Sequence, residues 1–461
     1  MQKDFISERK KKMQSAQLIP LSFLLAIVVG TILLMLPFST VEGESTDIVT
    51  ALFTATTSIC VTGLVVVDSF AHWTLFGKIV ILIMIQLGGL GIISVTSILM
   101  LAIHKRFSLE QSIVLHDAFN LSTVSGLMKF LSGVFKGTFI VEGIGALIYM
   151  IVFVPKFGPV GIWYSFFTSI SAFCNAGIDI LGPDSLISYN MNPIIIINTS
   201  LLIILGGLGY VVWFDFIKGV SEGRKKGYSP LLIFRRVSEH SKLVLKVTAF
   251  LILVGALGVF LMEYSNTDTI GNMPFGGKVM NSLFQSITFR TAGLAAVPQD
   301  KLTEGTCVMG LLWMFIGGSP VGTAGGVKTI TFFFCFLNTI SFIRNRNENV
   351  VCGRKVTSDM IHKASAIVSV SVLVTFILLI LLVCAEDVNL LDASYEMFSA
   401  TATVGLSRSL TPSLHTGGRL IVIIAMYLGR IGPISMALFF NKGGNKERNN
   451  ISYAKGNYFV G

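Results

Sequence analysis

A short phrase ending in glycine occurs four times in this chain of 461 residues, at nearly constant intervals. Each copy places small or β-branched residues before the glycine, and a short apolar segment before those. The copies are Val61-Thr62-Gly63, Asn175-Ala176-Gly177, Thr291-Ala292-Gly293 and Thr403-Val404-Gly405. Because internal periodicity of this kind decides a fold, the spacing predicts four equivalent structural units.

The residue types in these phrases suit the binding of a dehydrated cation. A potassium ion that has lost its water is coordinated in selective pores by rings of backbone carbonyls. Successive carbonyls can point at one axis only where the backbone takes unusual dihedral angles, which glycine adopts at little steric cost. We therefore expect the twelve residues named above to form a K⁺ selectivity filter with their backbones, while their side chains pack away. The alternative, glycines that serve helix packing, is common in membrane spans, but four equivalent copies favour a filter.

The composition indicates a membrane protein. Hydrophobic residues make up 52% of the chain, charged residues only 13%, and the mean hydropathy is +0.75. A soluble domain carries about 25% charged residues. Apolar runs near 18–37, 79–103, 193–217, 366–384 and 420–440 can each cross a bilayer, since a span takes about 20 residues. No cleavable signal peptide is expected, because a full-length apolar run follows the basic start.

Basic residues cluster at the two ends of the chain and between the repeats, for example at 9–12, 224–226 and 442–448. The positive-inside rule then places both termini and all repeat junctions in the cytoplasm, in a multi-pass protein of the plasma (inner) membrane. A net charge of +10 does not indicate nucleic-acid binding here, because the charges occupy short loops and form no compact basic domain.

Each repeat therefore crosses the lipid bilayer an even number of times. The segments 47–59, 161–173, 276–288 and 390–401 hold about 12 residues, or roughly 18 Å of helix, which is too short to span. Half-helices of this kind point carboxyl ends of partial negative charge at the centre. The irregular chain after them is tolerated only where it lines a cavity. The expected fold is an all-α membrane protein with four parallel helix–pore-loop–helix repeats around one central pore, pseudo-four-fold and potassium-channel-like.

The expected division of the chain follows the repeats. It comprises a cytosolic N-terminus (1–17), repeat 1 (18–103), repeat 2 with a preceding cytosolic segment (104–217), repeat 3 with a preceding cytosolic segment (218–342), repeat 4 (343–440) and a cytosolic C-terminal tail (441–461). Ser108-Leu109-Glu110-Gln111 has capping-box spacing and predicts the start of a cytosolic helix.

A second glycine-rich motif follows each phrase, at 87–91, 205–209, 316–318 and 428–432. The third copy extends to 328 and holds five glycines and a proline within ten residues, so a helix should break there. A small polar loop inside a span must line a cavity. We expect a flexible gate below the filter, with a mere kink as the alternative. Its residues would be Gly317, Gly318, Ser319, Gly322, Thr323, Gly325, Gly326 and Lys328.

Two arginines break the pattern. Arg430 takes the place of the second glycine of the motif and is expected near the middle of its span. A charge there costs about 2.5–3.5 kcal/mol and usually faces a cavity. Arg430 could act as an electrostatic barrier to cations or bind carbonyls of the 317–327 loop; a structural arginine is the alternative. Arg290 would repel an ion in the path, so its side chain should lie behind the filter, tied to an acid or to carbonyls.

With these residues the chain resembles the Trk/Ktr/HKT superfamily of potassium transporters, and most of all the bacterial KtrB membrane subunits. The four phrases, the 317–328 loop and 428–433 carry the resemblance, which covers about 18–461. It implies potassium uptake, a homodimer, and a partner in the form of a cytosolic ring of nucleotide-binding regulatory subunits (KtrA-like). Gly63 stands where some sodium-preferring plant relatives have serine, which implies potassium.

Other chemistry is not expected. The chain shows no nucleotide-binding motif, no metal-ligand or disulfide pattern among its six cysteines and no paired histidines, so we expect neither an enzyme nor an organic cofactor. Potassium is the transported ion, and sodium as an activator stays open. The alternative function is a sodium-coupled or sodium-selective secondary cation transporter, a class that often has inverted repeats; the common orientation of the four repeats disfavours it. A membrane scaffold without transport would need neither the phrases nor Arg430.

Overall fold

The computed structural model describes residues 15–91, 127–229, 236–346, 348–351 and 353–432. The capping box at 108–111 and the tail 441–461 lie outside these ranges. All regular structure within them is helical, apart from a small hairpin in which β1 (Val350–Val351) pairs antiparallel with β2 (Arg354–Lys355). The all-α expectation is therefore correct except for this hairpin.

A long helix, a short helix and a third helix follow one another four times along the described chain. Unit 1 comprises α2 (Ser15–Leu34), α3 (Ile48–Cys60) and α5 (Leu75–Leu90), and unit 2 comprises α8 (Leu127–Phe157), α9 (Val160–Cys174) and α10 (Pro193–Gly207). Unit 3 comprises α13 (Glu239–Glu263), α14 (Phe275–Thr288) and α15 (Glu304–Phe315), and unit 4 comprises α17 (Ser358–Ala385), α18 (Leu390–Thr401) and α19 (Thr416–Ile431). The short helices α3, α9, α14 and α18 match the bounds of the four predicted half-helices to within one residue at every end.

Smaller elements connect these helices. They are η1 (Pro37–Ser39), α4 (Ser69–His72), η3 (Ile187–Tyr189), η4 (Gln299–Lys301) and η5 (Thr411–Ser413), together with α11 (Tyr210–Lys225) after unit 2 and α16 (Thr329–Ile343) after unit 3. Polar caps begin two of the short helices. The Asp47 carboxylate accepts from the Val49 and Thr50 amides, and the Asn389 side chain accepts from the Leu391 amide. Each cap satisfies amides that a helix start leaves unpaired.

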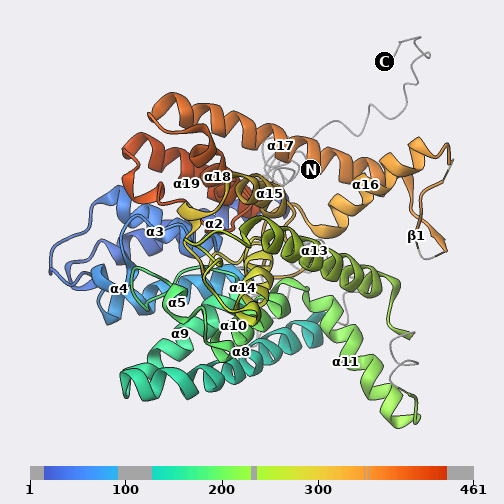
Figure 1. Ribbon diagram of the computed structural model, residues 1–461, viewed down its shortest axis with the longest axis horizontal. Coiled ribbons are helices and arrows are strands. Elements are labelled where there is room, and N and C mark those ends of the chain that lie inside the picture. The colour runs from blue at the N-terminus through green and yellow to red at the C-terminus, as the bar shows by residue number, and fades with distance from the viewer. Residues whose placement is uncertain (1–14, 92–126, 230–235, 347, 352, 433–461) are drawn as a thin grey trace, which may run out of the picture.

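The four units close into a ring. Each short helix packs against the long helix of its own unit, and the third helix of each unit packs against the short helix of the next: α5 on α9, α10 on α14, α15 on α18, and α19 on α3. In Figure 1 the units accordingly lie around a common centre, from blue through green and yellow to red. The short helices are thereby held on the inside.

Three described helices are long and apolar enough to cross a membrane, at Phe130–Phe157, Glu239–Glu263 and Ser358–Ala385. Much of their apolar surface faces outward: Leu147 is 63% and Phe250 is 64% exposed. Large exposed apolar side chains along a helix are expected where lipid is the neighbour. The pair α10 and α11 also passes as a span by composition, but it is bent by 97°.

That bend corrects one prediction. The run 193–217 is not one continuous span, because Gly209 takes φ 87° between α10 and α11. Gly91 (φ 82°) and Gly432 (φ 86°) end α5 and α19 in the same way. Positive φ is accessible to glycine without steric cost. Within the described residues, the third helices of units 1, 2 and 4 thus end close to a glycine of positive φ, and Arg430 lies in the last turn of α19.

The first glycine of the motif has a different role. A Cβ on Gly88, Gly206 or Gly429 would collide with a backbone carbonyl oxygen at the end of the short helix of the same unit. The carbonyls belong to Ile59, Phe173 and Thr401, each four residues before a loop glycine. These three step glycines let the third helix of the unit approach the end of its short helix.

We predict that Gly206→Ala destabilises the protein by about 1–3 kcal/mol, as overpacking of a filled core does. The matched control is Gly143→Ala in α8, where an added Cβ meets nothing within 4 Å and alanine is the better helix former. Thermal unfolding in detergent should give a lower midpoint for Gly206→Ala only. Equal midpoints for both variants would show that the contact with Phe173 is not tight.

Candidate functional site

The four loop glycines, Gly63, Gly177, Gly293 and Gly405, meet in the centre of the ring. Each lies against the carbonyl oxygen of the residue that precedes the next loop glycine, and the fourth lies against the first. A Cβ would stand 2.6 Å from Ala176 O on Gly63, 3.0 Å from Ala292 O on Gly177 and 2.5 Å from Val404 O on Gly293, and would collide with Thr62 O on Gly405. The contacts are cyclic, so all four predicted phrases come together at one place.

The backbone turns in the same way before each loop glycine. The residues two positions earlier are left-handed, with φ 55° at Val61, 59° at Asn175, 67° at Thr291 and 52° at Thr403. The glycines themselves also have positive φ, from 67° to 105°. Three of the left-handed residues are β-branched, for which this conformation is a genuine outlier. Strain of this kind persists only where the surroundings impose it, and it clusters at functional sites. We expected unusual dihedrals at the glycines alone.

Hydroxyl groups of the short helices hold the loops from behind. Thr57 Oγ1 accepts from the Gly63 amide at 2.9 Å and Ser399 Oγ accepts from the Gly405 amide at 3.0 Å. Ser171 and Thr288 instead donate to the carbonyls of Ile178 and Leu294, at 2.5 and 2.6 Å. The sequence analysis missed these residues. A Ser or Thr stands six residues before the loop glycine in three copies and five before it in the third, which is the signal that could have revealed them.

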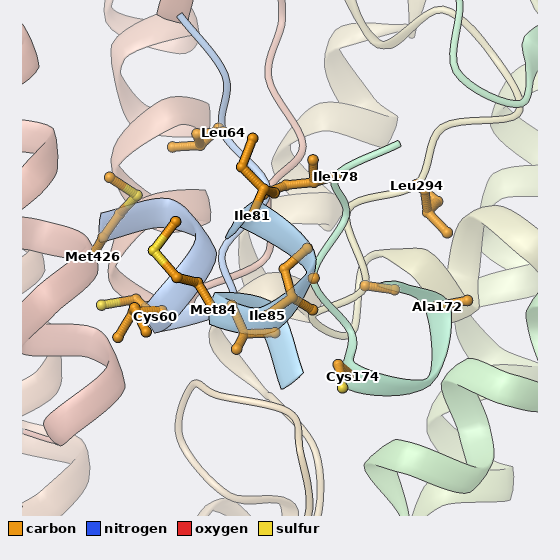
Figure 2. Close-up of a cluster of buried hydrophobic side chains, with 14 of the residues drawn as sticks. Cys60, Leu64, Ile81, Met84, Ile85, Ala172, Cys174, Ile178, Leu294 and Met426 are labelled. Carbon is orange, nitrogen blue, oxygen red and sulfur yellow. The ribbon is translucent and has the colours of Figure 1, made fainter. Parts of the chain in front are cut away.

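The side chains of the phrases are buried in protein. All eight residues that precede the glycines are at most 1% exposed. The residues that follow continue into the apolar core: Figure 2 shows Leu64 and Ile178 on the rising loops, with Cys60 and Cys174 near the ends of the corresponding short helices. These residues are thus shielded as a whole, and the hydroxyls of Thr62, Thr291 and Thr403 form no hydrogen bond with any described residue.

The 317–328 loop separates α15 from α16, as predicted. Its neck is closed by the Gly317 amide, which donates to Val327 O at 2.9 Å, and by the Val327 amide, which donates to Phe315 O at 3.2 Å. The loop docks on unit 2. Ser319 and Thr323 donate their amides to the carbonyls of Gly207 and Gly206, at 2.9 and 3.2 Å.

Two cations hold the far end of this loop. Arg430 Nη1 donates to Thr323 O at 2.6 Å, and its Nη2 donates to Gly88 O, so this side chain joins the loop to unit 1. Lys328 Nζ donates to Ala324 O at 2.5 Å. Gly325 lies directly against Thr403, since a Cβ there would collide with the Thr403 hydroxyl. The predicted gate residues and Arg430 thus occupy one region next to the loop glycines.

Arg290 lies behind the third loop, 8% exposed, and its Nη2 donates to Gly317 O at 3.3 Å. Of the two partners that the sequence left open, a carbonyl is the one observed. No carboxylate of the described chain forms an ion pair with it. On the other side of the loop glycines, Arg408 pairs with Asp392 at 2.6 Å. Burial raises the pKa of Asp179, two residues beyond Gly177, to about 6, although the Leu181 amide favours its charged form.

Membrane-length helices, four short helices ending at a shared centre and strained polar loops between them define a membrane transport protein. A family model described as "TrkH: Cation transport protein" matches residues 7–450. The chain belongs to this family, whose members are transporters and not enzymes.

Individual relatives and one solved structure agree with this assignment. The chain is 37% identical to "Ktr system potassium uptake protein B" of Bacillus subtilis, over 96% of each chain. It is 34% identical to "Potassium/sodium uptake protein NtpJ" of Enterococcus hirae, over 98% of each. The fold is similar to the potassium transporter TrkH from Vibrio parahaemolyticus, with a TM-score of 0.72 and 14% identity over 94% of this chain and 86% of that one.

We predict that Thr57→Val destabilises the protein by about 1–3 kcal/mol, because it leaves the Gly63 amide buried without an acceptor. The matched control is Thr56→Val on the same helix, since the Thr56 hydroxyl is buried and has no partner among the described residues. Thermal unfolding of both purified variants checks this. A Thr57→Val midpoint equal to that of Thr56→Val would mean that the hydroxyl does not support the loop.

Proposed function

We propose that this protein takes up potassium across the plasma membrane through a selectivity filter formed by its four loops. The observation that carries the proposal is the cyclic contact of each loop glycine with the carbonyl before the next. Carbonyls of the four phrases then surround one axis and replace the water of a dehydrated K⁺. The carboxyl ends of the four short helices add partial negative charge at that centre.

The strained backbone supports a filter made of carbonyls rather than side chains. Left-handed residues followed by glycine turn consecutive carbonyls toward one side, and the hydroxyls behind them fix that turn. The cyclic contacts involve the carbonyls of these phrases, so the proposal assigns the coordination of the ion to the backbone.

Relatives support the ion, the membrane and the partners. One is named for potassium uptake within a Ktr system, as its protein B. We infer that this chain likewise works in a homodimer with a cytosolic nucleotide-binding ring, and that both termini lie in the cytoplasm, as the basic junctions indicate. Another relative is named for potassium and sodium. Sodium transport, or activation by sodium, is therefore the second candidate, and flux of both ions must be measured.

The 317–328 loop is proposed as the gate of this path. It interrupts unit 3 and lies directly against the Thr403 side chain. Arg430 fastens the loop to unit 1 by two hydrogen bonds, and Lys328 adds a second positive charge. Cations close to an ion path of low dielectric raise the barrier for K⁺. Opening the path then requires the Arg430 bonds to break or to move with the loop.

We predict that Gly63→Ser lowers the potassium-to-sodium flux ratio of the purified chain in liposomes by about tenfold. A Cβ there would stand 2.6 Å from Ala176 O at φ 105°, so the carbonyl must shift by several tenths of an ångström, and about 1.4 kcal/mol of discrimination corresponds to that factor. The matched control is Gly43→Ser, which also has positive φ but meets nothing within 4 Å. An unchanged ratio for Gly63→Ser would exclude this position from the filter.

We predict that Arg430→Ala raises the potassium flux without any partner by about tenfold or more, since charge-assisted hydrogen bonds contribute roughly 1.5–3 kcal/mol each. Arg430→Lys should be intermediate, because it keeps the charge but cannot bind two carbonyls in a fork. Flux is measured in liposomes after thermal unfolding shows both variants to be folded. A folded Arg430→Ala with the wild-type flux would leave Arg430 a structural residue.

A further inference from the structure

A small cavity lies behind the third loop, at the boundary of units 2 and 3. Its volume is about 20 Å³, and Arg290, Thr248 of α13 and four isoleucines of α10, α13 and α14 line it. A single water molecule needs roughly 10–15 Å³ measured in this way. The cavity therefore has room for one water and for little else.

Two polar groups on this wall lack a partner. Arg290 Nε and Thr248 Oγ1 are buried and form no hydrogen bond with any residue that the structure describes. Thr248 itself is 7% exposed. Other buried helical threonines of this chain, such as Thr31 and Thr199, donate to the carbonyl four residues earlier, whereas Thr248 does not. Buried polar groups are almost always satisfied by protein or by ordered water.

The third loop is held by Thr288, which donates to Leu294 O, but its glycine amide does not have the hydroxyl acceptor found in the first and fourth loops. There the loop-glycine amide donates to a hydroxyl of the short helix, Thr57 or Ser399. The corresponding position in unit 3 is Ile287, which has no hydroxyl. Arg290 follows within the same loop and donates to Gly317 O, at the neck of the 317–328 loop.

We propose that the cavity binds one water molecule between Arg290 Nε and the Thr248 hydroxyl, and that Arg290, held in this way, is a positioning residue that fixes the third loop to the neck of the 317–328 loop. The water satisfies two groups whose burial would otherwise be costly. The guanidinium then has one bond to the neck of the 317–328 loop and one, through the water, to α13. The 317–328 loop therefore cannot move away from the third loop without breaking the bond between Arg290 and Gly317 O. This role rests on the proposed function; the water site does not.

The first test is structural. A high-resolution experimental map should show one density peak within hydrogen-bond distance of Arg290 Nε and Thr248 Oγ1, and the peak should vanish in Thr248→Val, which is nearly isosteric. An empty cavity in the wild type would overturn the water site. So would an anomalous peak there in crystals grown with bromide, because the guest would then be a halide.

The second test is potassium leak through the purified chain in liposomes, with the loop intact or with residues 320–325 removed. With the intact loop, Arg290→Lys and Thr248→Val should raise the leak about threefold to tenfold, the scale of one hydrogen bond to a charged group. Thr168→Val is the control, because that hydroxyl is also buried and unpartnered but lies outside the cavity. In the shortened-loop background, none of the three should add to the leak.

The outcomes separate the inference from the gate. If Arg290→Lys and Thr248→Val change the leak by the same factor in both backgrounds, Arg290 merely stabilises the fold and its positioning role is wrong. If shortening the loop alone leaves the leak unchanged, the proposed gate fails, while the map still decides the water site. Thr248→Val leaves the loop sequence intact, so it tests the role even where Arg290→Lys does not fold.

Discussion

The structure depends on one constraint: the amides and carbonyls of irregular backbone inside a membrane protein must find hydrogen-bond partners. Four loops without regular hydrogen bonding meet at the centre of an apolar protein, where an unpaired amide or carbonyl costs several kcal/mol. Hydroxyls of the short helices satisfy two loop-glycine amides. A side chain of the 317–328 loop satisfies a carbonyl near the end of a short helix, since Thr323 donates to Phe173 O. Each loop glycine lies against the carbonyl oxygen that precedes the next one, and in the proposed filter these carbonyls have a cation as their partner.

Glycine appears at two levels for two reasons. At the level of the loops, a side chain would occupy the space of the next carbonyl. One level away, the step glycines let a helix touch the end of a short helix, while Gly91, Gly209 and Gly432 end that helix with positive φ. Arg430 occupies the position that Gly89 has in unit 1, and Gly89 packs against Cys174. The corresponding glycines of the other units lie against side chains of neighbouring segments, such as Cys174 and Ala324.

Local signals predicted the short helices well, because each begins at a polar cap or at a proline, is followed by a glycine, and is too short to be a span. They failed at the third helices. The apolar run 193–217 reads as continuous, but the chain bends by 97° between α10 and α11, where Gly209 takes φ 87°. The left-handed conformations of Val61 and Thr403 could not be predicted, since β-branched residues disfavour them. Each belongs to a helix C-cap, because the following amides of Thr62 and Val404 donate back to the carbonyls of Thr57 and Ser399. Arg430 was predicted near the 317–327 loop, but its place at the end of α19 follows from the same unforeseen break.

A single chain with four unequal repeats can do what four identical subunits cannot. In a symmetric tetramer, an arginine at the position of Arg430 would appear four times around the axis, and four like charges in a medium of low dielectric would repel one another and any cation. Here the charge occurs once, and it faces a loop that also occurs once, in unit 3. Unit 3 in turn lacks the supporting hydroxyl at Ile287 and carries Arg290 instead. The departures from symmetry lie in adjacent units and contact one another, so the four-fold part of the design suits the binding of an ion and the asymmetric part suits the control of its passage.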